Sequence, residues 1–345
     1  MKVQKGGQME KKKKQIFLFV YFVFLFFSFF LNSEEVLFPV KFGGKWGYID
    51  KEGKLVIEYK FNEVSSFSEG LAPIKLESLF GYIDTKGGFV ISPKFQKAGP
   101  FSEGLAFVKE GNIFKGKYGY IDKTGKIVIE PQFDEVSSFS EGLAVIKTGD
   151  RYGYIDKTGK IVIKPQFDGA LPFCEGIARV KIGGFLGAKY GYIDKNGKFV
   201  INPQFIDGKS FSEGLALVKI EKKYGYIDKT GEVVIEPQFD DANSFSEGLA
   251  SVRIGNLLTG KWGYIDKTGK IVINPQFENA GFFSEGLADI KIKRKYGYID
   301  KTGKIVIEPQ FDEVSSFSNG LAKVKIEDKE GYIDKTGKYI WGPAQ

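Results

Sequence analysis

Two charged motifs recur along the sequence, and both contain residue types that enzymes use. The first is Asp-Lys-Thr-Gly-Lys, found for example at residues 122–126, which has the composition of a phosphate-binding loop. Such a loop follows the pattern Gly-x-x-x-x-Gly-Lys-Ser/Thr. Here five residues separate Gly119 from Gly125, and Ile127 follows the lysine, so both the spacing and the hydroxyl group are wrong. The motif also lacks the alternating carboxylates of a calcium loop. We therefore expect a tight turn closed by its Asp and Gly.

The second motif is Phe-Ser-Glu-Gly-Leu-Ala, whose glutamates could be compared with the paired carboxylates of glycosidases. These glutamates are Glu69, Glu103, Glu141, Glu175, Glu213, Glu247 and Glu285. A carboxylate that recurs in nearly every copy cannot mark one active site, so we expect a turn or capping role. The last copy has Asn319 instead, which we interpret as drift in a terminal repeat. Cys174 replaces the serine of this motif, and a lone cysteine is most often a packed residue.

The composition removes most catalytic chemistries. The 345 residues include no histidine, which excludes Ser-His-Asp and Cys-His nucleophile systems and His-ligated metals. A single cysteine permits neither an internal disulfide nor a Cys cluster for zinc or iron–sulfur. We predict a non-catalytic protein with no cofactor and no bound metal.

The positive charge is concentrated near the N-terminus. Residues 1–33 contain six lysines and one glutamate and so carry +5 of the net charge of +7. The nearly neutral remainder argues against nucleic-acid binding. Lysines at 11–14 precede an apolar stretch at residues 16–31, a pattern typical of a secretory signal peptide. We predict export to the periplasm, the outer surface or the medium, with anchoring to the membrane by residues 16–31 as the alternative.

Nine copies of one unit make up the rest of the chain. The tetrapeptide Gly-Tyr-Ile-Asp first begins at Gly47 and last at Gly331, and successive copies lie 34 or 38 residues apart. Residues 122–140 are identical to residues 300–318. This periodicity predicts one repeat array over residues 36–345 rather than a multidomain enzyme.

The copy around Gly153 shows the expected shape of the unit. Three segments rich in branched and aromatic residues predict antiparallel strands joined as a meander. They are residues 143–147, 151–156 and 160–163. In the connector between units, Phe133, Val136 and Phe139 recur at intervals of three, which predicts a single helical or 3₁₀ turn. Because one such unit cannot bury enough apolar surface alone, the units must stack on one another.

The sequence resembles the WG-repeat proteins, also called KWG-repeat proteins, which are mostly bacterial. The Trp-Gly pair of that family stands in phase at Trp46-Gly47 and Trp262-Gly263, while Tyr, Phe or Glu replaces the Trp in the other copies. The resemblance spans residues 36–345. It implies an all-β repeat fold and a binding or structural role, and it supplies no catalytic residues.

The ends of the array bear on whether it closes into a ring. The first unit begins with Leu37–Phe42 and the last ends after Ile340, so no unit is split between the two ends. Closed propellers usually share a split unit in that way, and their blades usually have four strands. We therefore favour an open or gently superhelical array of three-stranded units, with a toroid or propeller-like ring as the alternative.

Three units are longer because their first loop is extended. These loops read EGNIFKGK (110–117), IGGFLGAK (182–189) and IGNLLTGK (254–261). Each carries one adjacent apolar pair: Ile113 and Phe114, Phe185 and Leu186, or Leu257 and Leu258. If the loops project, they give a row of apolar tips, which is typical of an interaction surface. The alternative is that each pair packs onto the neighbouring short loop.

These features predict an exported scaffold that mediates protein–protein interaction at the cell envelope through the six loop residues. A membrane surface is a second candidate partner. The alternative function is a glycan- or peptidoglycan-binding module whose aromatic rings act as stacking platforms. Those rings would be Trp46, Tyr118, Tyr152, Tyr190, Tyr224, Trp262 and Tyr296. If the rings are mostly buried, the glycan hypothesis loses support.

Overall fold

The computed structural model describes residues 36–111, 115–184 and 187–342. The chain forms two compact units, Met1–Val36 and Leu37–Gln345, and every described strand belongs to the second. The segment predicted as a signal or anchor, residues 1–33, lies outside the described residues. Within them, no helix is long and apolar enough to span a bilayer.

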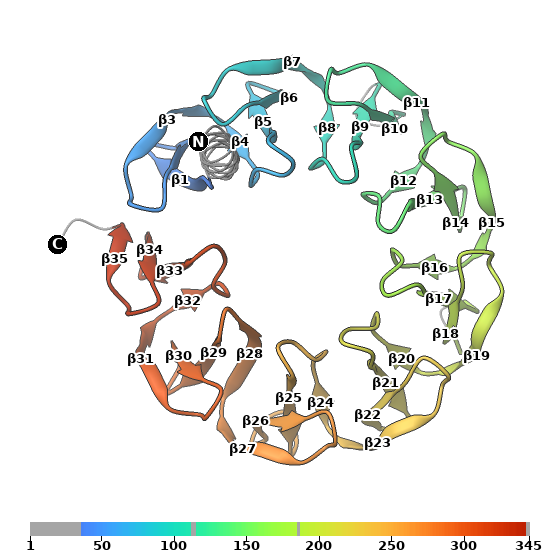
Figure 1. The fold of residues 1–345 in the computed structure, drawn as a ribbon, viewed down its shortest axis with the longest axis vertical. Helices are drawn as coiled ribbons and strands as arrows, with labels where there is room; N and C mark the ends of the chain where they lie inside the picture. The colour runs from blue at the N-terminus through green and yellow to red at the C-terminus, as the bar shows by residue number, and fades with distance from the viewer. Residues whose placement is uncertain (1–35, 112–114, 185–186, 343–345) are drawn as a thin grey trace, which may run out of the picture. The chain divides into compact units, whose positions relative to one another are not determined.

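The described strands of the second unit form nine antiparallel sheets arranged in a ring, and each sheet is one blade (Figure 1). Blade 1 consists of β1 (Phe38–Phe42), β2 (Lys45–Ile49) and β3 (Leu55–Phe61). Blade 2 consists of β4 (Glu63–Val64), β5 (Ala72–Leu76), β6 (Leu79–Ile83) and β7 (Phe89–Phe95). Blade 3 consists of β8 (Lys97–Ala98), β9 (Ala106–Glu110), β10 (Lys117–Ile121) and β11 (Ile127–Phe133).

Blades 4 to 6 repeat this plan. Blade 4 consists of β12 (Glu135–Val136), β13 (Leu143–Thr148), β14 (Arg151–Asp156) and β15 (Ile161–Phe167). Blade 5 consists of β16 (Gly169–Ala170), β17 (Ala178–Ile182), β18 (Lys189–Ile193) and β19 (Phe199–Phe205). Blade 6 consists of β20 (Asp207–Gly208), β21 (Ala216–Ile220), β22 (Lys223–Ile227) and β23 (Val233–Phe239).

Blades 7 to 9 complete the ring. Blade 7 consists of β24 (Asp241–Ala242), β25 (Leu249–Ile254), β26 (Lys261–Asp266) and β27 (Ile271–Phe277). Blade 8 consists of β28 (Asn279–Ser284), β29 (Leu287–Ile292), β30 (Lys295–Asp300) and β31 (Ile305–Phe311). Blade 9 consists of β32 (Glu313–Val314), β33 (Leu321–Ile326), β34 (Lys329–Asp334) and β35 (Tyr339–Trp341). The first strand of each four-stranded blade lies nearest the centre of the ring and the last lies on its outer edge (Figure 1).

The prediction of three-stranded units is wrong for eight of the nine blades, which have a fourth, innermost strand. In blade 4 this strand is β12, where Glu135 pairs with Lys147 and Val136 pairs with Ile146. The connector predicted as a helical turn is therefore extended. Its spacing of three misled because Val136 and Phe139 do share one apolar cluster, but they reach it from a short strand and the loop that follows.

The turn motif has the predicted geometric role. In blade 4, one carboxylate oxygen of Asp156 accepts hydrogen bonds from the backbone N–H groups of Thr158 and Lys160 and from the Thr158 hydroxyl group. Gly159 has a φ of 85°, the left-handed conformation that this turn needs. The motif is thus a hairpin turn between β14 and β15.

The glycine of Gly-Tyr-Ile-Asp has a packing role. A Cβ atom on Gly153 would lie 2.5 Å from the carbonyl oxygen of Ile163 and 2.7 Å from the nitrogen of Pro165, both on β15. No side chain fits at that distance. The glycine lets β15 approach β14 closely where the pairing register shifts, and this bend carries the outer strand across the blade.

The hydrophobic core lies between blades rather than inside them, as the stacking prediction required. One cluster combines Tyr154 and Phe167 of blade 4 with Phe173, Val180 and Ile193 of the blade 5 side. The fully buried Tyr154 ring contacts Phe173, and its hydroxyl group donates a 2.8 Å hydrogen bond to the Leu171 carbonyl oxygen. Each blade is therefore covered by the next one along the chain.

The expectation of an open array is wrong, because blade 9 packs on blade 1 in the same way. The Tyr332 hydroxyl group of blade 9 donates a 3.0 Å hydrogen bond to the Pro39 carbonyl oxygen of blade 1. The Tyr332 ring lies 5.5 Å from the Phe38 ring, and both belong to a cluster with Leu321 and Ile49. The fold is a closed nine-bladed β-propeller, and no described sheet shares strands from both ends. Side-chain packing closes the ring, so the absence of a split unit did not indicate an open one.

Blade 1 lacks the innermost strand in the described part of the chain. In blade 2, the Pro73 carbonyl oxygen accepts a hydrogen bond from the Ser65 N–H group just after the innermost strand. In blade 1, the equivalent Pro39 carbonyl oxygen accepts from Tyr332 instead. The closing hydrogen bond therefore uses an acceptor that the missing strand leaves available.

Closure can be tested by removing the hydroxyl groups of Tyr226 and Tyr332 separately, each as a Tyr→Phe variant. Tyr226 donates to the Asn243 carbonyl oxygen at 2.7 Å across a regular interface, and Tyr332 donates across the closing one. Each change should lower the free energy of unfolding by about 1 kcal/mol, because a buried carbonyl oxygen loses its donor. Urea unfolding followed by circular dichroism measures this. An effect of Tyr226→Phe alone would mean that the ring is open in solution.

Candidate functional site

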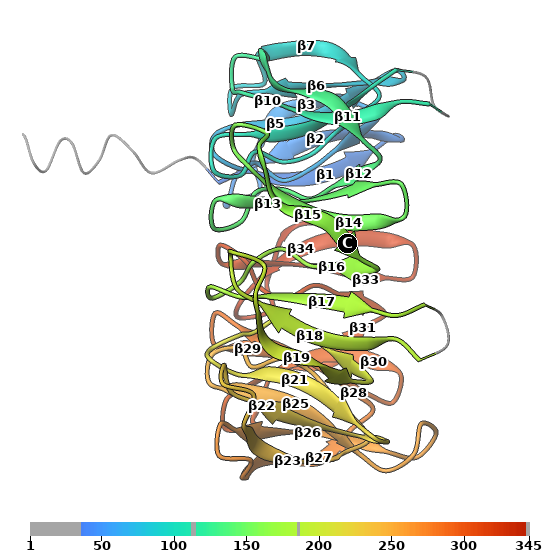
Figure 2. The same ribbon diagram turned by 90° about the vertical axis from the view of Figure 1, so that its right-hand side faces the viewer.

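The ring has two different faces, because the strands run across its thickness from one face to the other (Figure 2). One face, here the loop face, carries the loop between the second and third strands of each four-stranded blade, the equivalent β1–β2 loop of blade 1, and the connectors to the next blade. The other, here the clamp face, carries the Asp-Lys-Thr-Gly turns and the Ser-Glu-Gly turns. The sequence-predicted residues divide between these two faces.

The glutamates of the clamp face join neighbouring blades. The Glu103 carboxylate of blade 3 accepts a 3.0 Å hydrogen bond from the N–H group of Gly142 and lies 2.9 Å from the amino group of Lys157, both in blade 4. Burial by itself raises the pKa of Glu103, but the hydrogen bonds from Lys157 and Gly142 outweigh it and hold the pKa below its usual value. This ionised bridge is here called the clamp.

Each clamp glutamate occupies a strained backbone conformation. Glu103 has a φ of 54°, in the left-handed region that costs a residue with a side chain roughly 1 kcal/mol. The following Gly104 is also left-handed, with a φ of 87°. The two form a tight turn that points the carboxylate at the next blade. A structural role explains why the glutamate recurs, as predicted from its repetition.

Seven clamps connect blades 2 to 9 in sequence. They join Glu69 to Lys123, Glu103 to Lys157, Glu141 to Lys195, Glu175 to Lys229, Glu213 to Lys267, Glu247 to Lys301 and Glu285 to Lys335, with N–O distances of 2.9–3.2 Å. Among the described residues, neither interface of blade 1 has a clamp. Blade 2 has Thr85 in place of the lysine, and blade 9 has Asn319 in place of the glutamate. Asn319 therefore marks the closing interface and is more than drift in a terminal repeat.

The clamp lysine is the residue that sequence reasoning missed. Its glutamate lies 54 residues earlier in the chain in six clamps and 50 residues earlier in the seventh, always in the preceding blade, so the pair is invisible within one repeat. The sequence did carry one signal of this pairing. The only copies that lack the turn lysine or the glutamate have Thr85 and Asn319 instead, and both lie in the blades that flank blade 1.

Cys174 is a packed residue, as predicted. Its thiol donates to the Phe211 carbonyl oxygen at 3.2 Å, which reproduces the 2.7 Å hydrogen bond from the Ser140 hydroxyl group to Phe173 one blade earlier. Burial, together with the nearby carboxylates of Glu175 and Glu141, raises the pKa of the thiol. Within the described residues, no cluster of His, Cys, Asp or Glu is arranged to bind a metal ion.

The aromatic rings proposed as glycan platforms are half-buried and already covered. In blade 4 the Lys147 amino group lies 5.3 Å from the centre of the Tyr152 ring, whose hydroxyl group donates to Glu135. The other covering pairs are Lys41 with Trp46, Lys109 with Tyr118, Arg179 with Tyr190, Lys219 with Tyr224, Arg253 with Trp262 and Lys291 with Tyr296. A cation therefore occupies a ring face on which a sugar would stack. These rings act mainly in packing.

The loop face holds Leu257 and Leu258, two of the six residues predicted to bind a partner. Leu257 and Leu258 are 80% and 93% exposed, at the tip of the loop between β25 and β26. Their packing onto a neighbouring loop is thereby contradicted. The four remaining predicted residues, Ile113, Phe114, Phe185 and Leu186, lie outside the described residues.

Hydrogen bonds within this loop hold the leucine pair outward. The Asn256 side-chain oxygen accepts from the N–H groups of Leu258 and Thr259, and the Gly260 N–H group donates to the Asn256 carbonyl oxygen. At the base, the Asp240 carboxylate accepts from the Gly255 N–H group at 2.8 Å. The tip is therefore a shaped turn that presents apolar side chains to solvent.

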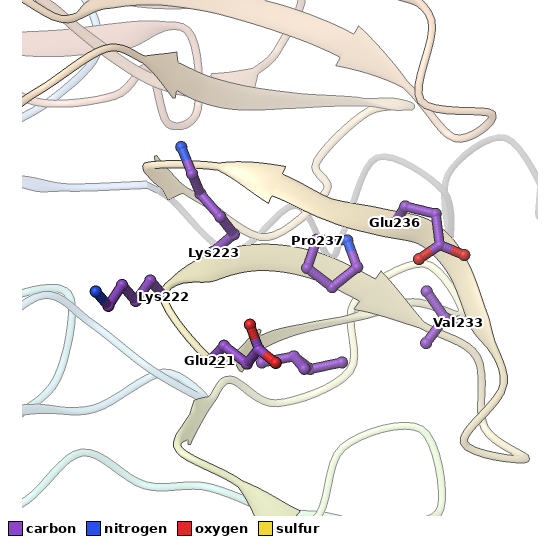
Figure 3. A pocket seen from close by; sticks show the side chains of 7 residues that line it. Glu221, Lys222, Lys223, Val233, Glu236 and Pro237 are labelled. Atoms are coloured by element: carbon purple, nitrogen blue, oxygen red, sulfur yellow. The ribbon is translucent and has the colours of Figure 1, made fainter.

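A hollow of about 830 Å³ lies on blade 6 and illustrates what the regular repeat offers. Its lining includes Glu221, Lys222, Lys223, Glu236 and Pro237, and no aromatic residue. Figure 3 shows the amino groups of Lys222 and Lys223 pointing in different directions, with Glu236 across the hollow. These groups do not converge on a common point, as an active site would require.

Comparison with known proteins agrees with this architecture. A family model described as "WG containing repeat" matches residues 46–79, 80–112, 118–152, 152–184, 190–224, 224–257, 262–296 and 296–329. A search of curated protein sequences gave no match. Among solved structures, a crystal structure of a eukaryotic initiation factor is 12% identical with a TM-score of 0.65, covering 90% of this chain and 96% of that one. Hsv2p of Kluyveromyces lactis is 8% identical with a TM-score of 0.41, covering 68% of this chain and 91% of that one. At 12% identity, the likeness to the initiation factor concerns the fold alone.

The clamp predicts a pH-dependent contribution to stability. Hydrogen bonds hold the pKa of Glu247 below its usual value against the opposing effect of burial, so its ionised form favours the folded state at neutral pH. Glu247→Gln should lower the free energy of unfolding by about 0.5 kcal/mol at pH 7. The difference from the parent should shrink as the pH falls below about 4, where the carboxyl group of the unfolded and then of the folded chain protonates.

Glu308→Gln, on the outer strand β31, is the matched control and should leave stability unchanged at either pH. Chemical unfolding at pH 7 and pH 3.5 measures both variants. Equal behaviour of the two would show that the clamp adds nothing to stability.

Proposed function

The chain belongs to the WG containing repeat family, and we propose that its propeller is an exported, non-catalytic scaffold that binds a partner protein at the cell envelope. Its contact surface is the row of three long loops on the loop face. The loops occur in blades 3, 5 and 7, so each is separated from the next by one blade with a short loop.

The observation that carries this proposal is the exposure of Leu257 and Leu258. Two adjacent leucines at 80% and 93% exposure cost hydration free energy that burial against a partner would recover. The loop that holds them is ordered by Asn256 and Asp240, so little conformational entropy is lost on binding. The two equivalent loops carry apolar pairs of the same kind in sequence.

The absence of histidine supports a non-catalytic role. The glutamates that recur in the repeat serve as clamps, and the aspartates of the turns accept hydrogen bonds from their own backbone. The blade 6 hollow collects charged groups that diverge. These residues thus have structural duties that account for their repetition.

Export rests on the sequence of residues 1–33, with its lysines followed by an apolar stretch. A retained anchor at residues 16–31 would place the propeller at the membrane surface instead. Both arrangements place the propeller among envelope proteins. Fractionation of cells producing the full-length chain, followed by N-terminal sequencing, distinguishes them.

Replacement of the leucine pair tests the contact surface. Leu257→Ser with Leu258→Ser should leave the melting temperature within about 1 °C of the parent, because both side chains are exposed. Cross-linking in intact cells should then lose the partner adducts of the parent protein. Val234→Ser with Val272→Ser, at exposed positions on the outer strands, is the control and should keep those adducts.

Three outcomes would contradict the proposal. A large fall in melting temperature would assign the leucine pair to packing. Retained cross-links would place the contact surface elsewhere. Loss of binding to lipid vesicles or to purified peptidoglycan, with protein cross-links unchanged, would replace the protein partner by a membrane or a glycan.

A further inference from the structure

A second hollow lies where the ring closes, between blade 9 and blade 1. It has a volume of about 610 Å³, and three aromatic residues line it: Phe42 and Tyr59 of blade 1, and Trp341 of blade 9. Residues almost 300 positions apart in the chain thus meet in one place. This cavity is here called the seam hollow.

All three aromatic residues depart from the repeat. Phe42 ends β1, and the equivalent position in blade 6 is Ile220. Tyr59 of β3 stands where blade 6 has Pro237, and Trp341 of β35 stands where blade 8 has Ile307. None of the other copies has an aromatic residue at any of these three positions. The blade 6 hollow therefore shows the ordinary form of this region, which contains Ile220 and Pro237 and no aromatic ring (Figure 3).

Packing at the closing interface explains Tyr59 and Trp341, but it does not explain Phe42. Tyr59 and Trp341 are partly buried against the cluster that closes the ring. The Phe42 ring lies 5.6 Å from the Tyr59 ring at an angle of 46°, yet Phe42 is 70% exposed. A side chain so exposed adds little to closure of the ring. Its ring instead extends the aromatic surface of Tyr59 outward.

The charged residues of the seam hollow balance each other. Two lysines, Lys41 and Lys329, and two carboxylates, Asp328 and Glu330, line the hollow together with the aromatic residues. The Glu330 carboxylate is held 2.8 Å from the amino group of Lys323. The hollow therefore has no net charge to attract an ion. It offers one exposed ring, that of Phe42, and two partly buried rings beside several hydrogen-bond donors and acceptors, the mixed lining of a small-ligand site.

We propose that the seam hollow binds a neutral oligosaccharide, with Phe42, Tyr59 and Trp341 as its stacking surface and Lys41, Asp328 and Lys329 as hydrogen-bonding partners of the hydroxyl groups. The apolar C–H face of a sugar ring matches an aromatic ring, and its hydroxyl groups need both donors and acceptors at the rim. The site is separate from the long loops and does not depend on the protein–protein contact proposed above.

Titration of the full-length chain with neutral oligosaccharides tests this proposal. The probes are cellotetraose and chitotetraose, followed by tryptophan fluorescence, since Trp341 lines the hollow, and by saturation-transfer NMR. Phe42→Ala should weaken binding about tenfold, because an exposed stacking ring is lost. Phe282→Ala is the matched control: Phe282 is another exposed aromatic residue, on β28 of blade 8, and its loss should leave binding unchanged.

A second variant restores the ordinary repeat. Phe42→Ile combined with Trp341→Ile recreates the residues found in other blades, and it should abolish binding while circular dichroism remains that of the parent. No binding of either sugar at about 10 mM, or equal binding by parent and Phe42→Ala, would overturn the proposal. Binding of a neutral proline-rich peptide that depends on Phe42, without sugar binding, would also overturn it and assign the hollow to a peptide partner.

Discussion

The structure depends on the burial of one tyrosine per blade beneath the next blade. A sheet of three or four short strands cannot cover its own aromatic side chains, so the ring of Tyr154 becomes fully buried only when blade 5 is in place. Its hydroxyl group then needs an acceptor, which the next blade supplies through a carbonyl oxygen. The same requirement applies to Tyr332 in the last blade. An open array would leave that tyrosine uncovered, and closure on Pro39 satisfies it.

Closure concentrates the irregularities of the molecule at blade 1. Among the described residues, this blade lacks an innermost strand and both of its interfaces lack a clamp. Residues around blade 1 therefore need not pair with an innermost strand or form a clamp, and they can differ from the repeat. Phe42, Tyr59 and Trp341 are departures of this kind, and they gather in one hollow. The long loops differ from the other copies by inserted residues, whereas the seam hollow differs from them by substituted residues.

The features predictable from sequence were those contained within one repeat. The Asp156 turn, the three longer strands and the need for stacking follow from spacings of a few residues. The loop sequence alone left open whether Leu257 projects or packs, and its exposure in the structure decides for projection. The innermost strand was missed because its two residues resemble a connector and pair only with the next strand along. Closure was missed because it joins Tyr332 to Pro39, which are 293 positions apart. The residue spacings within one repeat give no sign of such a contact.

The interface at which blade 9 meets blade 1 can nevertheless be recognised in the sequence, because it changes the residue type at a strained backbone position. A glutamate in the left-handed conformation is tolerable where its carboxylate gains a lysine and an N–H group in the next blade, as for Glu285. At Asn319, with a φ of 53°, the neighbouring blade is blade 1, whose Lys51 lies 3.7 Å from Glu52. Asparagine adopts left-handed φ more readily than glutamate, so it fits the same turn without needing a partner. The exception in the eighth turn therefore identifies the interface at which the ring closes.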